Sequence, residues 1–305
     1  RMQKKQTIAE AEVEKEKLNV DMYALNDRVN DLYFGILLLD EQIKQNTLLQ
    51  DELERNYRQI TAYVENGIAN QADLDAVKVE QLNTKQKRVD LVSSRAAYLK
   101  MLSLLVGEAL SPETVLEKPV PQSTVSAVSE IRRPELALFD AQGAGLQVQE
   151  KALNVRHLPQ FGLFVQGAYG NPGLDMLKNE FSPYYMAGVR LSWNFGSLYT
   201  LKNDRRVIEK KRQQLDNNRD VFLFNTRLEM TQQDQAIHSL EKQMRDDDEI
   251  IRLRTNIRKA AEAKVANGTL TVTEMLRELT NESLARQSKA MHEIQRLMGI
   301  YQLKY

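Results

Sequence analysis

Few residues in this sequence combine the types and the spacing that catalysis or metal binding requires. The three histidines, His157, His238 and His292, are isolated from one another and lack the spacing of metal ligands. Cysteine is absent, which excludes thiolate nucleophiles and disulfide bonds. We therefore predict that the chain is not an enzyme and that it carries neither a metal ion nor a cofactor.

Two other groups of residues could hold a ligand, but each has a simpler interpretation. The glycines of Gly143-Ala144-Gly145 are not preceded by a strand, so they do not form a phosphate-binding loop, and we interpret them as a site of close helix packing. The acidic run from Asp246 to Glu249 could bind a cation, although on a long helix it favours a solvated face.

The charge and the composition limit the class of protein. Lys and Arg number 42, as do Asp and Glu, and this balance lacks the basic excess of a nucleic-acid-binding protein. Only 13 glycines and 7 prolines occur in 305 residues, which is typical of long helices. The longest apolar stretch, Tyr33 to Leu39, is too short to be a transmembrane helix. We predict a mainly helical protein with no nucleic-acid partner.

Proline placement divides the chain into two helical arms and a centre. All seven prolines lie between Pro112 and Pro183. Because proline interrupts helices, the proline-free residues 1–111 and 184–305 are predicted to hold the long helices.

Each arm breaks once, at an Asn-Gly pair. The two breaks consist of Asn66, Gly67 and Ile68 in the first arm, and of Asn267, Gly268, Thr269 and Leu270 in the second. Asn-Gly at a helix end suits a left-handed cap, and Asn70 or Thr271 could cap the helix that follows. Each arm is therefore predicted to be a helical hairpin.

The two arms are predicted to be tandem copies of one hairpin. Gly67 and Gly268 are 201 residues apart, and several apolar residues match at this offset. The matching pairs include Ile36 and Ile237, Leu39 and Leu240, and Ala62 and Ala263. Apolar residues seven apart also predict a coiled-coil-like stripe after the first break, at Leu82, Val89 and Ala96 and at Val92, Leu99 and Val106.

Two strand patterns, Leu158–Gly170 and Tyr184–Gly196, lie in the centre. In the second, an apolar row alternates with a mostly polar row, as in a membrane-facing strand. Nine of the 20 aromatic residues fall within 157–199, and we predict an interfacial girdle from four of them: Tyr169, Tyr185, Trp193 and Phe195. A soluble hairpin with one face on a small core is the alternative, but no further strands are predicted that could complete a sheet.

Together these features resemble the TolC-like outer-membrane efflux family over nearly the whole chain. The motifs that carry the resemblance are, in chain order, Leu104-Leu105-Val106-Gly107, Arg133-Pro134-Glu135-Leu136, Leu158-Pro159-Gln160-Phe161 and Ser192-Trp193-Asn194-Phe195-Gly196. The family carries two strand hairpins in each protomer. At the 201-residue offset, residues 157–201 map to positions before Arg1, so we expect the first hairpin to be missing from this chain.

The resemblance implies a mainly α fold with long antiparallel coiled-coil-like helical hairpins in two tandem repeats. It also implies one transmembrane-type β-hairpin and a small mixed equatorial region. The implied segments are a first helical hairpin (1–106), an equatorial connector (107–133), a helix of the second repeat (134–157), the outer-membrane hairpin (158–196) and a second helical hairpin (197–305).

The resemblance further implies a passive export duct of a tripartite efflux or type I secretion system. Three protomers would form a tube in contact with outer-membrane lipid, and the helices would cross the periplasm toward an adaptor protein and an inner-membrane pump. The two Asn-Gly breaks would be docking tips, remote from any core. Asp73, Glu274 and Arg277 would lie at the periplasmic entrance, although Asp73 and Glu274 also suit a helix N-terminus. A soluble coiled-coil scaffold without a pore is the alternative function.

Overall fold

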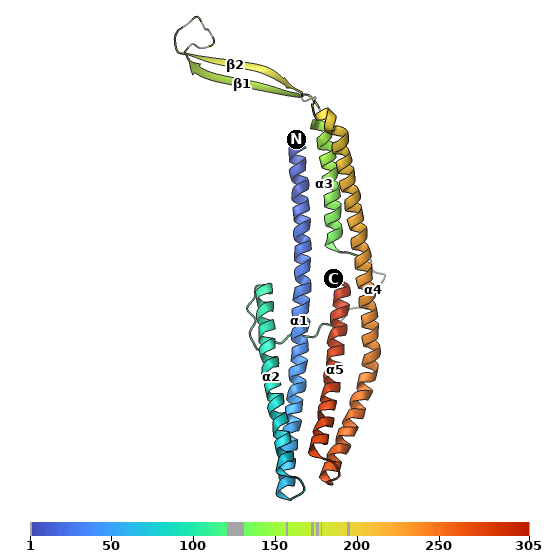
Figure 1. The fold of residues 1–305 in the computed structure, drawn as a ribbon. Coiled ribbons are helices and arrows are strands. Elements are labelled where there is room, and N and C mark those ends of the chain that lie inside the picture. The colour runs from blue at the N-terminus through green and yellow to red at the C-terminus, as the bar shows by residue number, and fades with distance from the viewer. Residues whose placement is uncertain are drawn as a thin grey trace. The chain divides into compact units, whose positions relative to one another are not determined.

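The computed structural model describes residues 2–120, 131–156, 158–171, 174, 177, 179–193 and 196–304. Within these residues, five helices and one antiparallel pair of strands follow one another along the chain (Figure 1). Their bounds are α1 Met2–Glu65, α2 Gln71–Val106, α3 Pro134–Arg156, β1 Gln160–Gly170, β2 Ser182–Ser192, α4 Gly196–Ala266 and α5 Val272–Lys304. The predicted mainly α fold, with two long helical hairpins and one strand hairpin, is confirmed.

These elements form two compact units, and the long helices α1 and α4 contribute to both. The first unit comprises Arg1–Val20 and Arg132–Phe224, and the second comprises Asp21–Ile131 and Asn225–Tyr305. The strand hairpin and α3 belong to the first unit, whereas α2, α5 and both turns between helices belong to the second. None of the described helices is both long enough and apolar enough to cross a membrane.

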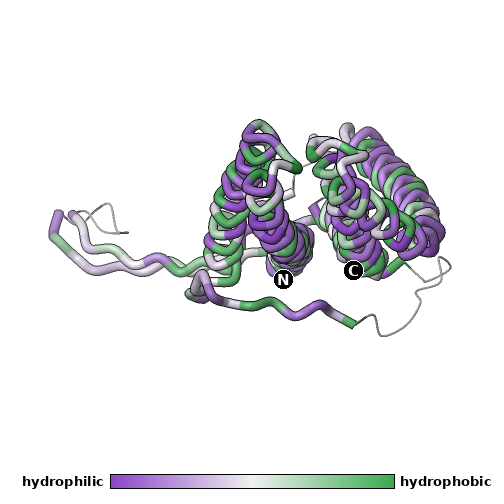
Figure 2. Tube along the Cα trace, turned by 90° about the horizontal axis from the view of Figure 1, so that it is seen from below, coloured by the Kyte–Doolittle hydropathy of each residue, from purple (hydrophilic) through white to green (hydrophobic). Residues whose placement is uncertain are grey.

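The second unit has a core that all four of its helices build. Viewed along the helices, α1 with α2 and α4 with α5 form two pairs, with hydrophilic and hydrophobic residues mixed around each helix (Figure 2). The core cluster consists of Leu53, Ile60, Val77, Ala261, Val265, Val272, Met275, Leu276 and Leu279. Ala69 and Leu270, one from each turn, pack against this cluster. The core therefore reaches both turns.

Farther from the turns, α1 is buried on two sides. Ile36 packs with Leu99 of α2, and Phe34 packs with Ile294 of α5. Leu116, in the segment that follows α2, packs against both of these clusters. This burial on two sides accounts for the long apolar stretch of α1.

Of the residues predicted to form the seven-residue stripes in α2, Leu99 packs within this chain, whereas Leu82, Val89 and Ala96 are exposed. Leu82 is 51% exposed and Val89 is 60% exposed. Three other residues with the same spacing are buried instead: Val77, Thr84 and Leu91. The carbonyl of Thr84 accepts a hydrogen bond from Asn46 of α1 at 3.1 Å. Both stripes have the period of a helix pair, and the position of the partner helix decides which one is covered.

The two strands pair antiparallel, with Gln160 opposite Ser192 and Gly170 opposite Ser182. β2 therefore begins two residues earlier and ends four residues earlier than the predicted Tyr184–Gly196. Pro183 is accommodated within β2 because both strands of a two-stranded sheet are edge strands, where a missing N–H group is tolerated.

Candidate functional site

The turn between α1 and α2 is held by its own hydrogen bonds. Gly67 has a φ of 71°, the left-handed conformation that glycine adopts without strain. The N–H groups of Gly67 and Ile68 donate to the carbonyls of Val64 (3.1 Å) and Tyr63 (2.8 Å) at the end of α1. The side chain of Asn66 also donates back to the last turn of α1, at 2.7 Å. The Asn-Gly pair thus terminates the helix as the sequence predicts.

The turn between α4 and α5 has the same geometry. Gly268 has a φ of 64°, and its N–H donates to the carbonyl of Val265 at 2.9 Å. Thr269 donates to the carbonyl of Lys264 from its N–H (2.9 Å) and from its hydroxyl (3.1 Å). The side chain of Asn267 donates back to α4 at 2.9 Å. The two turns are therefore equivalent parts of the tandem repeat.

Each helix that follows a turn begins with a reciprocal cap. Asn70 accepts a hydrogen bond from the N–H of Asp73 (3.0 Å), and the Asp73 carboxylate accepts one from the N–H of Asn70 (3.1 Å). Thr271 and Glu274 exchange the same two bonds, both at 3.2 Å. The hydroxyl of Thr271 also donates to the Glu274 carboxylate, and this bond, with the one from the Thr271 backbone, lowers the pKa of Glu274.

The predicted entrance residues are thus placed at the starts of two neighbouring helices. Asp73 and Glu274 have local roles as caps, which is the alternative that the sequence left open. Arg277 lies one turn farther along α5 than Glu274 and is exposed. A role of these three residues at an entrance remains a prediction.

The residues of the two turns differ in exposure. Ile68 is 52% exposed, and its counterpart Thr269 is exposed as well. Ala69 and its counterpart Leu270 are partly buried against the core. The expectation that the tips are remote from any core is therefore wrong for Leu270, because the core of four helices extends to the turns.

A buried cluster of charges joins three helices of the second unit. Glu282 of α5 is 5% exposed and accepts hydrogen bonds from Arg258 (2.6 Å) and Thr255 (2.8 Å) of α4. Arg258 also pairs with Glu52 of α1 at 3.4 Å. Burial alone would raise the pKa of Glu282, but hydrogen bonds from Arg286, Arg258 and Thr255 outweigh it and lower the pKa. The sequence does not predict this cluster, because the contacts that join α1, α4 and α5 connect residues that are distant in sequence.

One face of the strand hairpin is apolar and uncovered. The antiparallel register aligns the apolar row of β1 with that of β2, and the shared face contains Phe161, Leu163, Val165, Ala187, Val189 and Leu191. The exposed fractions of its large side chains range from 58% for Leu191 to 86% for Leu163. No described element of the chain buries this face, and an uncovered apolar face of this kind is typical of a surface that contacts another protein or a membrane.

Three of the four predicted girdle residues lie in the described part of the chain. Tyr169 and Tyr185 are exposed where the strands meet their loop, and Tyr169 stacks on Phe181 with 5.8 Å between ring centroids. Trp193 is exposed directly after β2, at the opposite end of the hairpin. Phe195 lies outside the described residues. A girdle formed by these residues remains a prediction.

The sequence predicted that the acidic run of α4 forms a solvated face, but part of the run is buried. Asp247 is 5% exposed and lies 2.9 Å from His292 of α5, and Asp248 pairs with Lys289 at 2.5 Å. These contacts fasten α5 to α4. Among the described residues, no three potential ligands form a group that could hold a metal ion. His157 lies outside the described residues.

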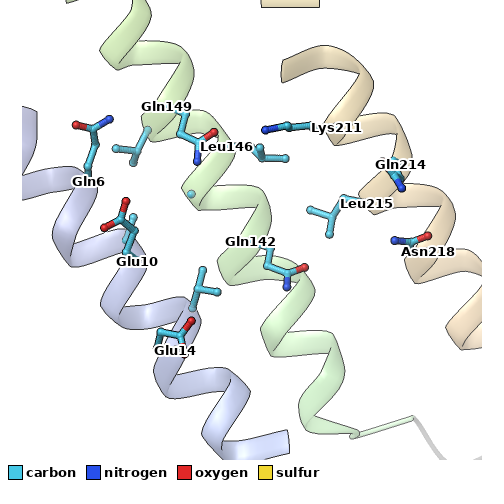
Figure 3. A pocket seen from close by; sticks show the side chains of 14 residues that line it. Gln6, Glu10, Glu14, Gln142, Leu146, Gln149, Lys211, Gln214, Leu215 and Asn218 are labelled. Atoms are coloured by element: carbon cyan, nitrogen blue, oxygen red, sulfur yellow. The ribbon is translucent and has the colours of Figure 1, made fainter. Parts of the chain in front are cut away.

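A groove of about 400 Å³ lies between α1, α3 and α4 within the first unit, lined by side chains such as Gln142 and Gln149 (Figure 3). A Cβ added at Gly145 would lie 4.0 Å from Val13, and one added at Gly143 would lie 3.8 Å from Leu215. Alanine would therefore fit at both positions, so close packing does not require these glycines. The lining combines amide and aliphatic side chains with the charged side chains of Glu10, Glu14 and Lys211 (Figure 3).

Comparison with known proteins identifies the fold. No protein-family model and no curated protein sequence matches this chain. Among solved structures it is similar to the outer membrane protein VceC from Vibrio cholerae, with a TM-score of 0.76 and 12% identity over 98% of this chain and 73% of that chain. It is also similar to the Campylobacter jejuni CmeC outer membrane channel, with a TM-score of 0.74 and 12% identity over 98% of this chain and 66% of that chain. A third similar structure is that of CusC, whose structures concern transmembrane channel formation, with a TM-score of 0.76 and 15% identity over 99% of this chain and 73% of that chain.

Proposed function

We propose that this chain, which has the TolC-like channel fold, is one protomer of an outer-membrane channel. The channel would be a passive duct for drugs or other small molecules in a tripartite efflux or type I secretion system. One observation carries the proposal: in chain order, a strand hairpin with an uncovered apolar face lies between two copies of the same helical hairpin. A passive duct needs no catalytic residue, metal ion or cofactor.

The strand hairpin supports a membrane location. Two strands are too few to be stable as a sheet in water, and each leaves one edge unpaired. In a bilayer those edges must be paired, because the hydrocarbon offers no water to the backbone. Strands from further copies would pair the edges and place the apolar face against lipid. We therefore propose a homotrimer with a strand barrel in the outer membrane and helices that extend into the periplasm.

The two turns support a docking site for a periplasmic adaptor protein. Each turn is the end of its helical hairpin, and both belong to the same compact unit. The exposed residues at this end are Asn66, Gly67, Ile68, Asn267, Gly268 and Thr269, with Leu270 packed behind them. The adaptor would connect this surface to an inner-membrane pump.

A recording in planar lipid bilayers tests the proposed channel. The natural gene product should migrate as a trimer in detergent and produce discrete conductance steps. Deletion of residues 158–196 should abolish the conductance while leaving the helix content measured by circular dichroism. If the deletion variant conducts equally well, or if the natural protein never inserts, the alternative of a soluble coiled-coil scaffold is favoured.

Neutralising the two capping carboxylates should lower the cation preference of the proposed channel. A threefold set of Asp73 and Glu274 at the entrance would attract cations. The double variant Asp73→Asn and Glu274→Gln removes the charges, while both amides can still accept the capping hydrogen bonds. In single-channel recordings we expect the permeability ratio of K⁺ to Cl⁻ to fall at about 0.1 M salt, with a smaller difference at about 1 M because of screening.

The matched control for this prediction is Glu229→Gln, which removes an exposed carboxylate from the middle of α4. It should leave the permeability ratio unchanged. An unchanged permeability ratio in the double variant would show that Asp73 and Glu274 do not lie at the entrance.

A further inference from the structure

The two long helices share a charge pattern that the proposed channel does not explain. Residues 2–9 of α1 contain two lysines and no carboxylate, whereas residues 10–31 contain seven carboxylates and three basic residues. Residues 196–213 of α4 contain six basic residues and two carboxylates, whereas residues 214–249 contain four basic residues and nine carboxylates. Although the chain has zero net charge, both helices begin basic and then turn acidic.

The basic residues occupy equivalent places in the tandem repeat. At the 201-residue offset, Lys4 and Lys5 of α1 correspond to Arg205 and Arg206 of α4. All four belong to the first compact unit, which also contains the strand hairpin. Pairs of basic residues thus occur at equivalent positions in the two repeats.

Part of the basic cluster of α4 has a structural role. Arg205 donates to the side chain of Asn154 at 2.6 Å, and Arg212 pairs with Glu150 at 3.1 Å. Both contacts are made with α3. These two residues fasten α3 to α4 and need no further partner.

The remaining basic residues of the cluster are exposed, and one of them, Lys211, also lines the groove between α1, α3 and α4. Four of them are exposed: Lys202, Arg206, Lys210 and Lys211. Three of these, together with Asn203, Val207 and Gln214, line a shallow groove on α4. With the described residues these four form no ion pair, and the amine of Lys210 donates to the amide of Gln213 at 3.0 Å. Their charge is therefore available to an external anion.

The spacing of these charges destabilises the helix that carries them. Lys202, Arg206 and Lys210 are four residues apart in turn, so like charges are neighbours on one face. Such pairs repel one another unless an anion lies between or above them. An anionic partner at this face would remove that cost.

Exposed aromatic residues adjoin the cationic face on the side of the strand hairpin. Tyr199 is 90% exposed and lies three residues before Lys202, on the same face of α4. Trp193 is 48% exposed and follows β2 directly. Aromatic side chains next to Lys and Arg, beside an apolar segment, are typical of the surface of a membrane.

We propose that six residues form a cationic collar that binds the phosphate headgroups of anionic phospholipids: Lys4, Lys5, Lys202, Arg206, Lys210 and Lys211. The location of the collar rests on the proposed function, since a hairpin within the membrane would place the first turns of α4 at the membrane surface. The collar then fixes the depth at which the hairpin sits. Its repetition in α1 and α4 would give each protomer two points of attachment.

Co-sedimentation of the 305-residue chain with lipid vesicles tests the collar. The probes are vesicles of phosphatidylcholine alone and vesicles in which about one quarter of the lipid is phosphatidylglycerol. The test variant carries Lys202→Gln, Arg206→Gln, Lys210→Gln and Lys211→Gln. The matched control carries Lys242→Gln, Arg245→Gln, Lys259→Gln and Lys264→Gln, which removes the same charge from exposed positions farther along α4.

The unsubstituted chain should prefer the anionic vesicles, and this preference should fall steeply between about 0.05 and 0.5 M salt. Each basic residue near an anionic surface strengthens binding roughly fivefold, so the test variant should bind about 100-fold or more weakly. The control variant should bind as the unsubstituted chain does. Equal loss in both variants, or equal binding to both kinds of vesicle, overturns the collar.

The outcome separates from that of the proposed function. If the natural protein conducts in bilayers but the chain shows no preference for anionic vesicles, only the collar fails. If the preference is present and the test variant alone loses it, while no conductance is found, only the channel fails.

Discussion

Replacement of Ile68 by arginine is expected to abolish export and adaptor binding while leaving the fold intact. Ile68 is 52% exposed at the first turn and its side chain is not part of the core, so the folded protein should tolerate the charge. Burial of such a side chain against a partner contributes about 1.5–3 kcal/mol, and an unpaired charge at that place adds a desolvation cost. We therefore expect adaptor affinity to fall roughly 100-fold or more.

Adaptor crosslinking and drug resistance in cells that produce the natural protein would measure this effect. Ile68→Val is the matched control because it keeps an apolar surface of similar shape, and it should retain activity. Leu270→Arg is not an equivalent test, since Leu270 packs against the core and its loss would destabilise the tip. If Ile68→Arg reaches the outer membrane at a normal level and still supports resistance, the turns are not the docking site.

The second large effect is expected from Glu282→Gln, which should lower the free energy of unfolding by about 3 kcal/mol. The substitution keeps the size of the side chain but leaves Arg258, itself largely buried, without its closest partner on α5. Urea unfolding followed by circular dichroism would measure the change. The control is Glu249→Gln, which removes an exposed partner of Arg252 on α4 and should not change stability measurably. Equal stability of Glu282→Gln and the unsubstituted chain would show that the cluster does not hold the helices together.

The same cluster predicts a dependence on pH. The pKa of Glu282 in the folded chain lies below its ordinary value of 4.5. A carboxylate with a lowered pKa stabilises the fold fully above that ordinary value, and this contribution is lost as the pH falls through the folded pKa. The stability difference between the unsubstituted chain and Glu282→Gln should therefore be complete at pH 7 and shrink below about pH 4.5. A difference that stays constant into the acid range would contradict a role for the ionised carboxylate.

Short-range features of this protein could be predicted from its sequence. The turns follow from Gly67 and Gly268, because only glycine adopts a positive φ without strain. They also follow from Asn70 and Thr271, because each side chain accepts a hydrogen bond from the N–H three residues later and so caps the helix that follows. The apolar face of the hairpin follows from alternation, since side chains of a strand point to opposite sides in turn. The tandem repeat follows from matched residues at a constant offset.

Other features were decided only by the tertiary structure, because they depend on elements that are distant in sequence. Val77 is buried and Val89 is exposed, although both belong to stripes with the same period, since α1 covers only one of these stripes. Leu270 packs against the core because four helices converge at the turns. The ion pair of Glu52 with Arg258 joins residues 206 positions apart, and no local rule connects them. Local backbone geometry and periodicity are written in neighbouring residues, whereas burial and charge pairing are set by the packing of whole helices.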